Sequence, residues 1–415
     1  MKINTEIKDT IFKRLAITLG IILFIRLGTF LPIPGINHSD LAFYIQSHSV
    51  TRSLVSTFAG NDTFVIGLFT LNIFPYINAS ILVQLILGFS PQLSKLQKEG
   101  DLEGRRSINR LTRFITLIWA IIQSVSLTIY LKQILFDWNY TLALEIVIWL
   151  TTGAMIILWL SELITDYGLG NGASLLIYTN IISSLPNISK TIFSGNGTNI
   201  TFSSEIGIIC LLLAALYGIV FLQEGLRIIP LISSKQLNQS PSQDGLKSNS
   251  YIPLRFNQAG VMPIILTTAV LVVPNYASSI GLFPKIDFPE ALSFFYWIGY
   301  FFLILLFSSF YSTIVLNPKD MSDQLQKMSV AIPGIRPGIQ TTFYLKQVMK
   351  RTTLVGATIL ATLATIPNFI ESTLNITNLN GLSSTSLLIL AGVVLDLVRE
   401  VKNIYFSNVY NNMYQ

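Results

Sequence analysis

The chain has 415 residues, of which 51% are apolar and only 12% are charged, and its mean hydropathy is +0.59. Soluble domains carry about twice that charged fraction, so this composition excludes an ordinary soluble protein. The formal net charge of +6 could indicate a nucleic-acid partner, but the positions of the cations have a topological explanation. The single cysteine, Cys210, lies in an apolar run, and one cysteine excludes a disulfide framework within the chain.

Ten apolar stretches predict ten transmembrane helices, although several are shorter than the about 20 residues that cross a bilayer core. In chain order the predicted spans cover residues 15–32, 73–89, 112–131, 142–163, 172–186, 206–223, 257–274, 293–316, 353–370 and 382–398. Before the second span, a broken apolar segment at about 54–70 predicts a short plug helix that dips in from the outer side. Irregular backbone survives at membrane depth only beside protein or water, so this segment suggests a cavity.

The Lys and Arg residues gather in alternate gaps between these spans. Twenty-two of the 27 lie in or beside the two terminal segments and three long gaps, at about 90–111, 224–256 and 317–352. The other gaps hold only four cations, and Arg26 lies near the end of the first span. Cations next to spans stay on the cytoplasmic or stromal side, so both termini and the three long gaps are predicted to face that side.

Ten spans with both termini on one side can form two halves of five. Because five is odd, the second half would be inverted, as in many membrane conduits and carriers. We therefore expect an N-terminal half at 1–186 and a C-terminal half at 187–415. The last long gap, 317–352, alternates charged with apolar residues and carries two Pro-Gly turns. A plain connection needs far fewer residues, so this gap predicts a projecting hairpin that meets a partner in the aqueous compartment.

Eight motifs follow one another from the first span to the tenth: FLPIPGI, FPYINASILVQLI, EGRRSINRLTRF, DYGLGNGASLLI, IPLRFNQAGVMP, NPKDMSDQL, AIPGIRPGIQT and TSLLILAGVVLD. Together they resemble the SecY family, the central channel subunits of the bacterial and plastid Sec protein translocase. The resemblance implies an all-α membrane protein with ten transmembrane helices in two inverted, pseudo-symmetric halves around an hourglass pore. It also implies a plug helix and a lateral gate, through which signal sequences leave while secreted chains pass through the pore. The implied protein is a channel and not an enzyme.

The resemblance places a ring of aliphatic side chains at the pore constriction, formed by Ile77, Ile81, Ala173, Ile177, Ile265 and Ile389. Residues 77 and 81, like 173 and 177, are four apart and lie on one face of a helix. Such a collar excludes water and ions, as hydrophobic gates do, yet it can deform around a passing polypeptide. Ala173 is smaller than the usual residue and should loosen the ring. The alternative is that these are ordinary buried or lipid-facing side chains.

Polar residues inside spans are costly and usually functional. In the family these spans border the lateral gate, so the resemblance implies a hydrogen-bonded polar seam of Asn78, Ser80, Gln84, Gln123 and Asn257. A signal helix would replace the contacts of this seam and open the gate. The alternative is simple packing between helices.

The loops on the basic side are where the resemblance implies contacts with partners. The candidate residues are Arg255, Lys319, Lys327 and Arg336, and the implied partners are a SecA-type ATPase or the ribosome. SecE-like and SecG-like small subunits, preproteins with signal sequences and membrane lipid complete the expected set. No cofactor and no metal ion is implied.

Other functions find little support in the sequence. His38 and His48 share one outer loop without a third metal ligand. The GLGNG segment at 168–172 follows a membrane span and lacks the Lys of a P-loop, so a tight turn between spans four and five is the better interpretation. A secondary transporter with an inverted repeat would share the span count, but a carrier needs an ionisable or polar cluster at the midplane. Here the candidate midplane is aliphatic, which favours the channel.

The composition also bears on location. The chain is compact and rich in Ile, Asn and Lys, and its first apolar stretch lacks a small-residue cleavage site, so we expect that stretch to be retained. These features are typical of a plastid-encoded protein. We therefore expect the thylakoid membrane, with the bacterial plasma membrane as the alternative.

The charge pattern makes a testable prediction about topology. Ser242 lies in the long basic gap at 224–256, whereas Ser194 lies in a gap with one cation. In a Cys210→Ala background, an impermeant thiol reagent added from the stromal or cytoplasmic side should label Ser242→Cys and spare Ser194→Cys. Permeabilised membranes, in which both cysteines react, are the control. Labelling of Ser194→Cys with protection of Ser242→Cys would reverse the assigned orientation.

Overall fold

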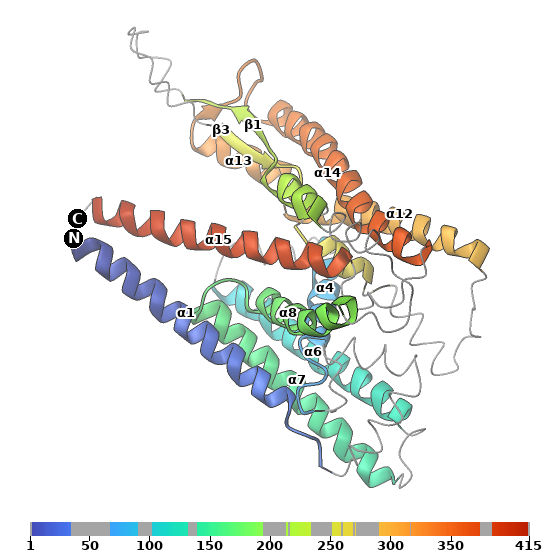
Figure 1. Cartoon of the computed structure of the whole chain (residues 1–415). Coiled ribbons are helices and arrows are strands. Elements are labelled where there is room, and N and C mark those ends of the chain that lie inside the picture. Colours follow the sequence, from blue (N-terminus) through green and yellow to red (C-terminus); the bar gives the residue numbers. More distant parts are fainter. Residues whose placement is uncertain are drawn as a thin grey trace. The chain divides into compact units, whose positions relative to one another are not determined.

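The structure is a computed structural model in which helices dominate (Figure 1). It describes residues 2–34, 67–89, 102–131, 139–193, 213–233 except 215, 251–270 except 259 and 269, 290–373 except 316, and 384–413. Each of the ten predicted spans contains helix within these residues. Most of the predicted plug, residues 54–66, lies outside them.

Contacts divide the chain into two compact units. The first unit consists of Met1–Glu205, Ala269–Ile286 and Ile376–Gln415, and the second consists of Ile206–Thr268 and Asp287–Asn375. The last span therefore packs with the N-terminal helices. The division into sequence halves at 186/187 stays a prediction.

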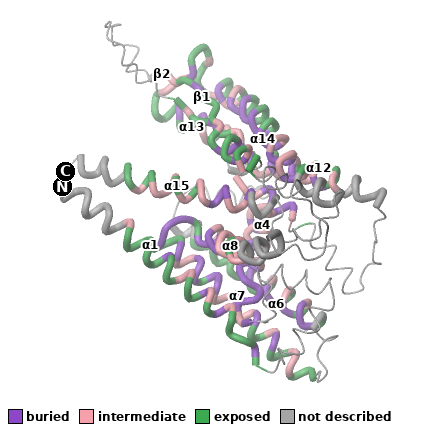
Figure 2. Tube along the Cα trace, viewed as in Figure 1, coloured by how far each residue is buried: buried purple, intermediate pink, exposed green. Residues whose placement is uncertain are grey.

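The described residues of the first unit form six long helices: α1 (Lys2–Thr29), α4 (Phe74–Phe89), α6 (Leu102–Leu131), α7 (Tyr140–Tyr167), α8 (Gly172–Phe193) and α15 (Ser384–Met413). Helix α7 packs against α1, α6 and α8, while α15 packs against α8 and α1, and α4 against α6. The sequence of α7 explains its central position, because its fully buried residues Ile146, Leu150, Ile157 and Ile164 recur at helical spacing. Figure 2 shows how buried and exposed residues alternate along this helix.

A buried irregular segment, residues 67–73, directly precedes α4 and is hydrogen-bonded to the residues that follow α1. The Leu68 amide donates a hydrogen bond to the Leu31 carbonyl at 3.0 Å. Side chains from Phe69 to Ile73 are all buried. Gly153 of α7 lets the segment approach, because a Cβ at that position would lie 2.0 Å from the Leu68 carbonyl oxygen. Irregular backbone is thus enclosed by protein, as membrane depth requires.

The predicted tight turn between α7 and α8 is confirmed. Gly170 has φ +82°, a conformation that glycine adopts without steric cost. The Thr18 hydroxyl of α1 accepts a hydrogen bond from the Leu169 amide at 3.2 Å, and the Thr165 hydroxyl accepts one from the Gly172 amide at 3.0 Å. The Asn171 side chain accepts one from the Ala173 amide at 3.1 Å and caps α8. Neighbouring helices therefore fix where α8 begins.

In the second unit, α12 (Glu290–Val315) and α14 (Ile339–Thr373) pack side by side. Helical residues 216–224 and 262–268 belong to the same unit. Gly356 allows α14 to touch the entry to the seventh span, because a Cβ there would lie 2.1 Å from the Phe256 carbonyl oxygen.

Two long basic-side gaps of the second unit fold together. Strand β1 (Leu226–Pro230) pairs antiparallel with β3 (Tyr251–Arg255), and β2 (Ile232–Ser233) pairs antiparallel with β4 (Val330–Ala331). Helix α13 (Pro318–Lys327) and the first turns of α14 complete this part, which we call the basic-side module. Its buried core contains Ile229, Leu254, Leu325, Ile332, Leu345, Val348 and Met349.

The segment 317–352, predicted as a projecting hairpin, contains two helices that pack against each other, and its projection from the membrane stays a prediction. The segment forms α13, the short strand β4, a turn and the start of α14. Leu345, Val348 and Met349 recur at helical spacing and need an apolar partner. Ile229 and Leu254 of the other gap supply it, so the segment folds against the rest of the module.

Two described helices, Arg106–Ile129 and Tyr140–Tyr167, are long and apolar enough to cross a membrane by length and composition, and so is the range Trp297–Lys327, which contains most of α12 followed by α13. Phe74–Leu87 and Gly172–Ser183 are apolar but shorter. Several helices continue past the predicted span on the basic side. Helix α14, for example, begins 14 residues before residue 353, because charged residues that lower hydropathy still favour helix.

The contact at Gly153 yields a stability prediction. Gly153→Ala should lower the thermal unfolding midpoint in detergent, with a cost of about 1–3 kcal/mol, because the new methyl group collides with the Leu68 carbonyl. Gly20→Ala in α1 is the matched control, since a Cβ there meets nothing within 4 Å, and its midpoint should stay equal or rise slightly. Equal destabilisation by both substitutions would contradict the close approach.

Candidate functional site

The structure places five of the six ring candidates in the first unit. Ile77 and Ile81 lie one turn apart on α4 and are 6% and 9% exposed, and Ala173 at the start of α8 is 8% exposed. Ile177 of α8 and Ile389 of α15 are half-buried. Helices α8 and α15 are in contact. Ile265 belongs to the second unit, where it lies half-buried in helical residues 262–268.

The position of Ile77 and Ile81 depends on the buried segment that precedes α4. Asn72 has φ 49°, and its side-chain oxygen accepts a hydrogen bond from the Ile73 amide at 2.8 Å. The Ile73 carbonyl in turn accepts from the Ile77 amide at 3.1 Å. A short polar residue tolerates this left-handed backbone, so Asn72 directs the chain into α4.

The polar-seam candidates have different surroundings. Asn78, Ser80 and Gln84 are half-buried on α4, and the Ser80 hydroxyl donates to the Ile77 carbonyl at 2.9 Å. Asn257 is buried, and its amide nitrogen donates to the Gly260 carbonyl at 2.9 Å. Gln123 of α6 has a buried side-chain oxygen that accepts no hydrogen bond among the described residues. Ser80 and Asn257 thus satisfy local backbone groups, whereas Gln123 keeps an open acceptor.

A polar cluster in the second unit was missed by sequence reasoning. The Ser312 hydroxyl of α12 lies 2.8 Å from the Thr353 hydroxyl of α14, and it donates to the Gln258 side-chain oxygen at 3.1 Å. Ser312 and Thr353 are buried. Ser and Thr are common in apolar helices, so their positions in the sequence do not reveal such a cluster. The two polar residues 257–258 at the start of a predicted span could have indicated a buried polar contact there.

Arg26 also acquires a partner. Its guanidinium donates to the backbone carbonyl of Thr179, so α1 is linked to α8 across the first unit. The sequence showed this cation inside a span but did not indicate its partner. Buried cations in membrane helices pair with carbonyls in this way.

Arg113 and Glu162 join α6 to α7. The guanidinium donates from Nε to Oε1 at 2.9 Å and from Nη2 to Oε2 at 2.7 Å. This fork-to-fork arrangement is the strongest form of such a pair. Arg113 therefore has a structural role in addition to its place among the topological cations.

The turn that carries Arg336 is held in a defined shape. Gly334 and Gly338 have φ of +77° and +104°, as the Pro-Gly pairs on both sides of Ile335 and Arg336 require. The Ser322 hydroxyl donates to the Gly338 carbonyl at 3.0 Å, and the Thr341 hydroxyl donates to the Arg336 carbonyl at 2.9 Å. Arg336 itself is exposed. The basic-side module therefore presents this guanidinium from an ordered turn.

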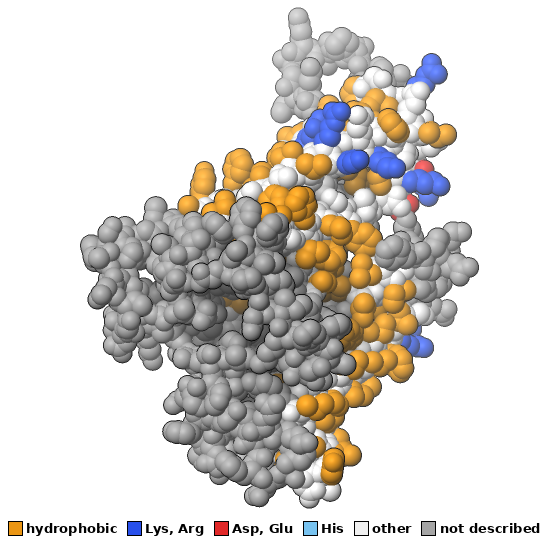
Figure 3. All heavy atoms as spheres, turned by 90° about the vertical axis from the view of Figure 1, so that its right-hand side faces the viewer, with side chains coloured by type: hydrophobic (Ala, Val, Ile, Leu, Met, Phe, Trp, Pro, Cys, Tyr) orange, Lys and Arg blue, Asp and Glu red, His pale blue; other side chains and the backbone are white. Residues whose placement is uncertain are grey.

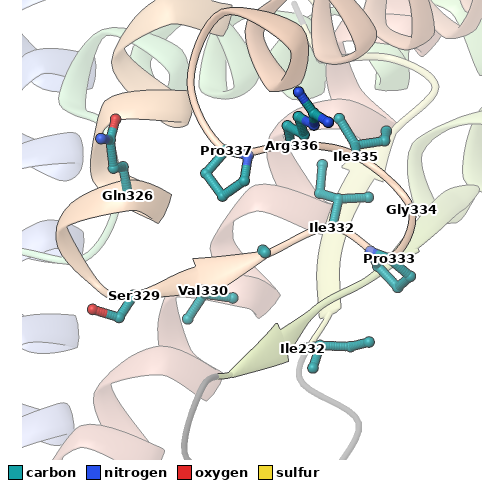
Figure 4. A pocket seen from close by; sticks show the side chains of 11 residues that line it. Ile232, Gln326, Ser329, Val330, Ile332, Pro333, Gly334, Ile335, Arg336 and Pro337 are labelled. Atoms are coloured by element: carbon teal, nitrogen blue, oxygen red, sulfur yellow. The ribbon is translucent and has the colours of Figure 1, made fainter. Parts of the chain in front are cut away.

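A groove of about 600 Å³ lies beside this turn. Its lining comes from Ile232 of β2, Gln326 at the end of α13, and residues 329–337 (Figure 4).

The other candidates of the module, Arg255, Lys319 and Lys327, are exposed. Lys and Arg side chains gather among apolar ones at the upper end of the described surface in Figure 3. A concave apolar surface with cations nearby suits a protein or nucleic-acid partner.

Within the described ranges, no three His, Cys, Asp or Glu side chains come close enough together to hold a metal ion. His38 and His48 lie outside these ranges.

Comparison with known sequences identifies the family. The family model described as SecY matches residues 67–398. A protein translocase subunit SecY from Trieres chinensis is 60% identical over 422 residues and covers 99% of each chain. The corresponding proteins of Porphyra purpurea and Synechocystis sp. are 43% and 39% identical, with at least 93% of every chain covered.

Solved structures confirm the predicted all-α channel fold. A SecY chain from a study of its plug domain superposes with a TM-score of 0.68 at 18% identity, covering 97% of this chain and 94% of that one. A chain from the structure of a protein-conducting channel gives a TM-score of 0.65, also at 18% identity and with the same coverage. On these matches, which extend over nearly the whole sequence, the chain belongs to the SecY family of protein translocase channel subunits.

Proposed function

We propose that the chain conducts unfolded preproteins across its membrane through a pore closed by the six-residue aliphatic ring, and releases signal and transmembrane segments laterally into the lipid. The full-length similarity to translocase subunits, up to 60% identity, is the observation that carries this function. The family is one of channels without enzymatic activity, which removes the secondary transporter as an alternative.

Packing of α8 against α15 supports the ring. A Cβ at Gly170 would lie 2.6 Å from the Leu397 side chain, so these residues mark one level of the two helices. As the fifth and tenth spans, α8 and α15 run in opposite directions. Ile177 lies seven residues beyond Gly170, and Ile389 lies eight residues before Leu397. Both are therefore about 10–12 Å from that level, and we infer that they come to the same depth.

Gln123 is the strongest candidate of the lateral-gate seam. A buried amide oxygen without a donor costs about 1–3 kcal/mol, and Gln123 has such an oxygen within the described part of the chain. A signal helix that brings a donor would recover this cost on opening. Asn78 and Gln84 lie on α4, which packs against the helix of Gln123, so they belong to the same proposal.

The basic-side module is the proposed docking site for the ribosome or motor that delivers the preprotein to the channel. Ribosome–channel complexes are among the structural relatives, namely the canine Sec61 complex and the yeast Ssh1 complex. We extend this to a SecA-type ATPase, and to SecE-like and SecG-like subunits beside the membrane helices. Relatives from plastids and cyanobacteria support the thylakoid as the location.

The ring can be tested by making it polar. Ile389→Asn, and to a lesser degree Ile81→Asn, should raise ion conductance and allow weak signal sequences to pass. A buried polar side chain costs about 1–3 kcal/mol in the closed state, which corresponds to a rise of roughly 5- to 150-fold in the open population. Ile389→Leu, which keeps the site apolar, is the matched control. If planar-bilayer conductance and signal stringency stay at the wild-type level in both Asn variants, these residues do not form the ring.

The docking site can be tested at Arg336. Arg336→Glu should block preprotein import without unfolding the membrane helices, because an exposed guanidinium can bind acidic or phosphate groups of a partner bidentately and a carboxylate would repel them. Arg336→Lys should have an intermediate effect, since it keeps the charge and loses the fork.

Import and motor binding are compared in membranes with equal amounts of each protein. Lys402→Glu, which reverses an exposed cation in the second half of α15, is the charge control. If membranes with Arg336→Glu import preprotein at the wild-type level, Arg336 contributes only to the topology of the chain and not to docking.

A further inference from the structure

We propose that Gln258, Ser312 and Thr353 form a latch that holds the seventh span against α12 and α14 while the channel is closed, and that release of this latch sets how strong a signal sequence must be. The proposal deepens the proposed channel function and rests on it. It assigns specificity-determining residues that lie outside both the aliphatic ring and the polar seam.

The latch is a chain of hydrogen bonds across three elements. The Ser312 hydroxyl of α12 donates to the Gln258 side-chain oxygen at 3.1 Å, and it lies 2.8 Å from the Thr353 hydroxyl of α14. Because a hydroxyl group has a single hydrogen to donate, Thr353 is the donor to Ser312. Ser312 and Thr353 are buried. Hydrogen bonds in such a chain strengthen one another away from water.

The neighbouring backbone brings Gln258 within reach of α12. The Phe256 amide donates to the Gly225 carbonyl at 3.1 Å, and a Cβ at Gly356 of α14 would lie 2.1 Å from the Phe256 carbonyl oxygen. Gly356 lies one turn after Thr353, so the same part of α14 meets both the backbone and the side chains at the start of the seventh span. The latch is therefore built on a close contact between helix and backbone.

The latch joins an element that moves on opening to two elements that need not move. The seventh span carries the ring candidate Ile265 and the seam candidate Asn257, whereas α12 and α14 carry no candidate of either kind. Helix α14 is also held at its basic end, where Leu345 and Val348 lie in the core of the basic-side module. A shift of the seventh span by about 1 Å away from α12 lengthens the Gln258 contact beyond a hydrogen bond. Opening therefore breaks the latch.

The latch is poised for release because its last member is only half satisfied. The Gln258 side-chain nitrogen is buried and has no acceptor among the described residues. A buried donor without an acceptor opposes the state that contains it. Movement of the seventh span would let this nitrogen reach water or a carbonyl group, which offsets part of the loss at the oxygen. The latch therefore holds the closed state by a small margin, as a channel that yields to a bound signal requires.

The experiment measures signal stringency with the full chain in proteoliposomes, together with its small partner subunits and the translocation ATPase. The probe is a pair of precursors that differ only in the signal, one complete and one with a shortened apolar core. The readout is the import rate of the weak-signal precursor relative to that of the complete one. The variants are Ser312→Ala and Thr353→Val, each of which removes one latch hydroxyl with little change of shape.

The chain offers two matched controls on the same helix. Thr353→Ser keeps the hydroxyl and should behave as the wild type does. Thr352→Val removes the neighbouring hydroxyl, which is also buried but bonds to the Val348 and Met349 carbonyls of its own helix at 3.0 Å. This control can lower the thermal unfolding midpoint, but it should leave the relative import unchanged. A purely structural role of buried hydroxyls would give the same result at both positions.

Thr353→Val should raise the relative import of the weak-signal precursor about two- to tenfold, the range expected when the closed state loses one hydrogen bond. Ser312→Ala breaks both bonds of the latch and should have the larger effect. The double variant should not exceed Ser312→Ala alone, because both substitutions break one chain. If Thr353→Val disturbs folding, import of the complete precursor falls, and Ser312→Ala, which removes a single oxygen, decides the test.

Three results would overturn the latch: wild-type stringency in both variants, an equal change in Thr352→Val, or a fall in the relative import of the weak-signal precursor. Failure of the channel function is a separate outcome. If wild-type proteoliposomes import neither precursor, the proposed function fails. If they import the complete precursor, and Ile389→Asn relaxes stringency while the latch variants do not, only the latch is wrong.

Discussion

The first unit depends on one close backbone contact, in which the Leu68 carbonyl lies against Gly153 of α7. This contact allows an irregular segment to lie between helices at membrane depth, where unsatisfied backbone groups are expensive. The segment satisfies itself through the Leu31 carbonyl and the Asn72 side chain. Because α4 begins directly after it, the same contact determines where the ring candidates on α4 lie.

The second unit must form an ordered surface in water from the loops of a membrane protein. Both long gaps contribute residues to one buried core. Together they bury Ile229 and Leu254 against Leu325 and Leu345. The Arg336 turn is built on that core through the hydroxyl groups of Ser322 and Thr341.

Much of the fold could be predicted from the sequence, because transmembrane helices are encoded locally by long apolar runs. The ends on the basic side could not. Helix α14 begins at Ile339 and α15 continues to Met413, well beyond the apolar parts that hydropathy detects, since helix formation continues through polar residues. Strand β4 could not be predicted either, because its pairing with β2 joins residues that are distant in sequence.

For the candidate site, motif resemblance identified residues, and the structure supplied their partners. Ile77 and Ile81 lie on one buried face of α4, as their spacing predicted. The contact between Arg26 and Thr179 could not be predicted, because a backbone carbonyl leaves no mark in the sequence. The same holds for the cluster of Ser312, Thr353 and Gln258. These residue types are common in apolar helices, so their contacts become visible only once the helices are packed.

The pairing of β2 with β4 has a consequence for how the protein is made. About 100 residues separate Ile232 from its partner Ala331, so at about 5–20 residues per second β2 waits roughly 5–20 s during synthesis. The eighth span is also made in that interval. The docking surface is therefore absent until most of the channel has been inserted. Assembly order alone would keep a half-built channel from recruiting a motor.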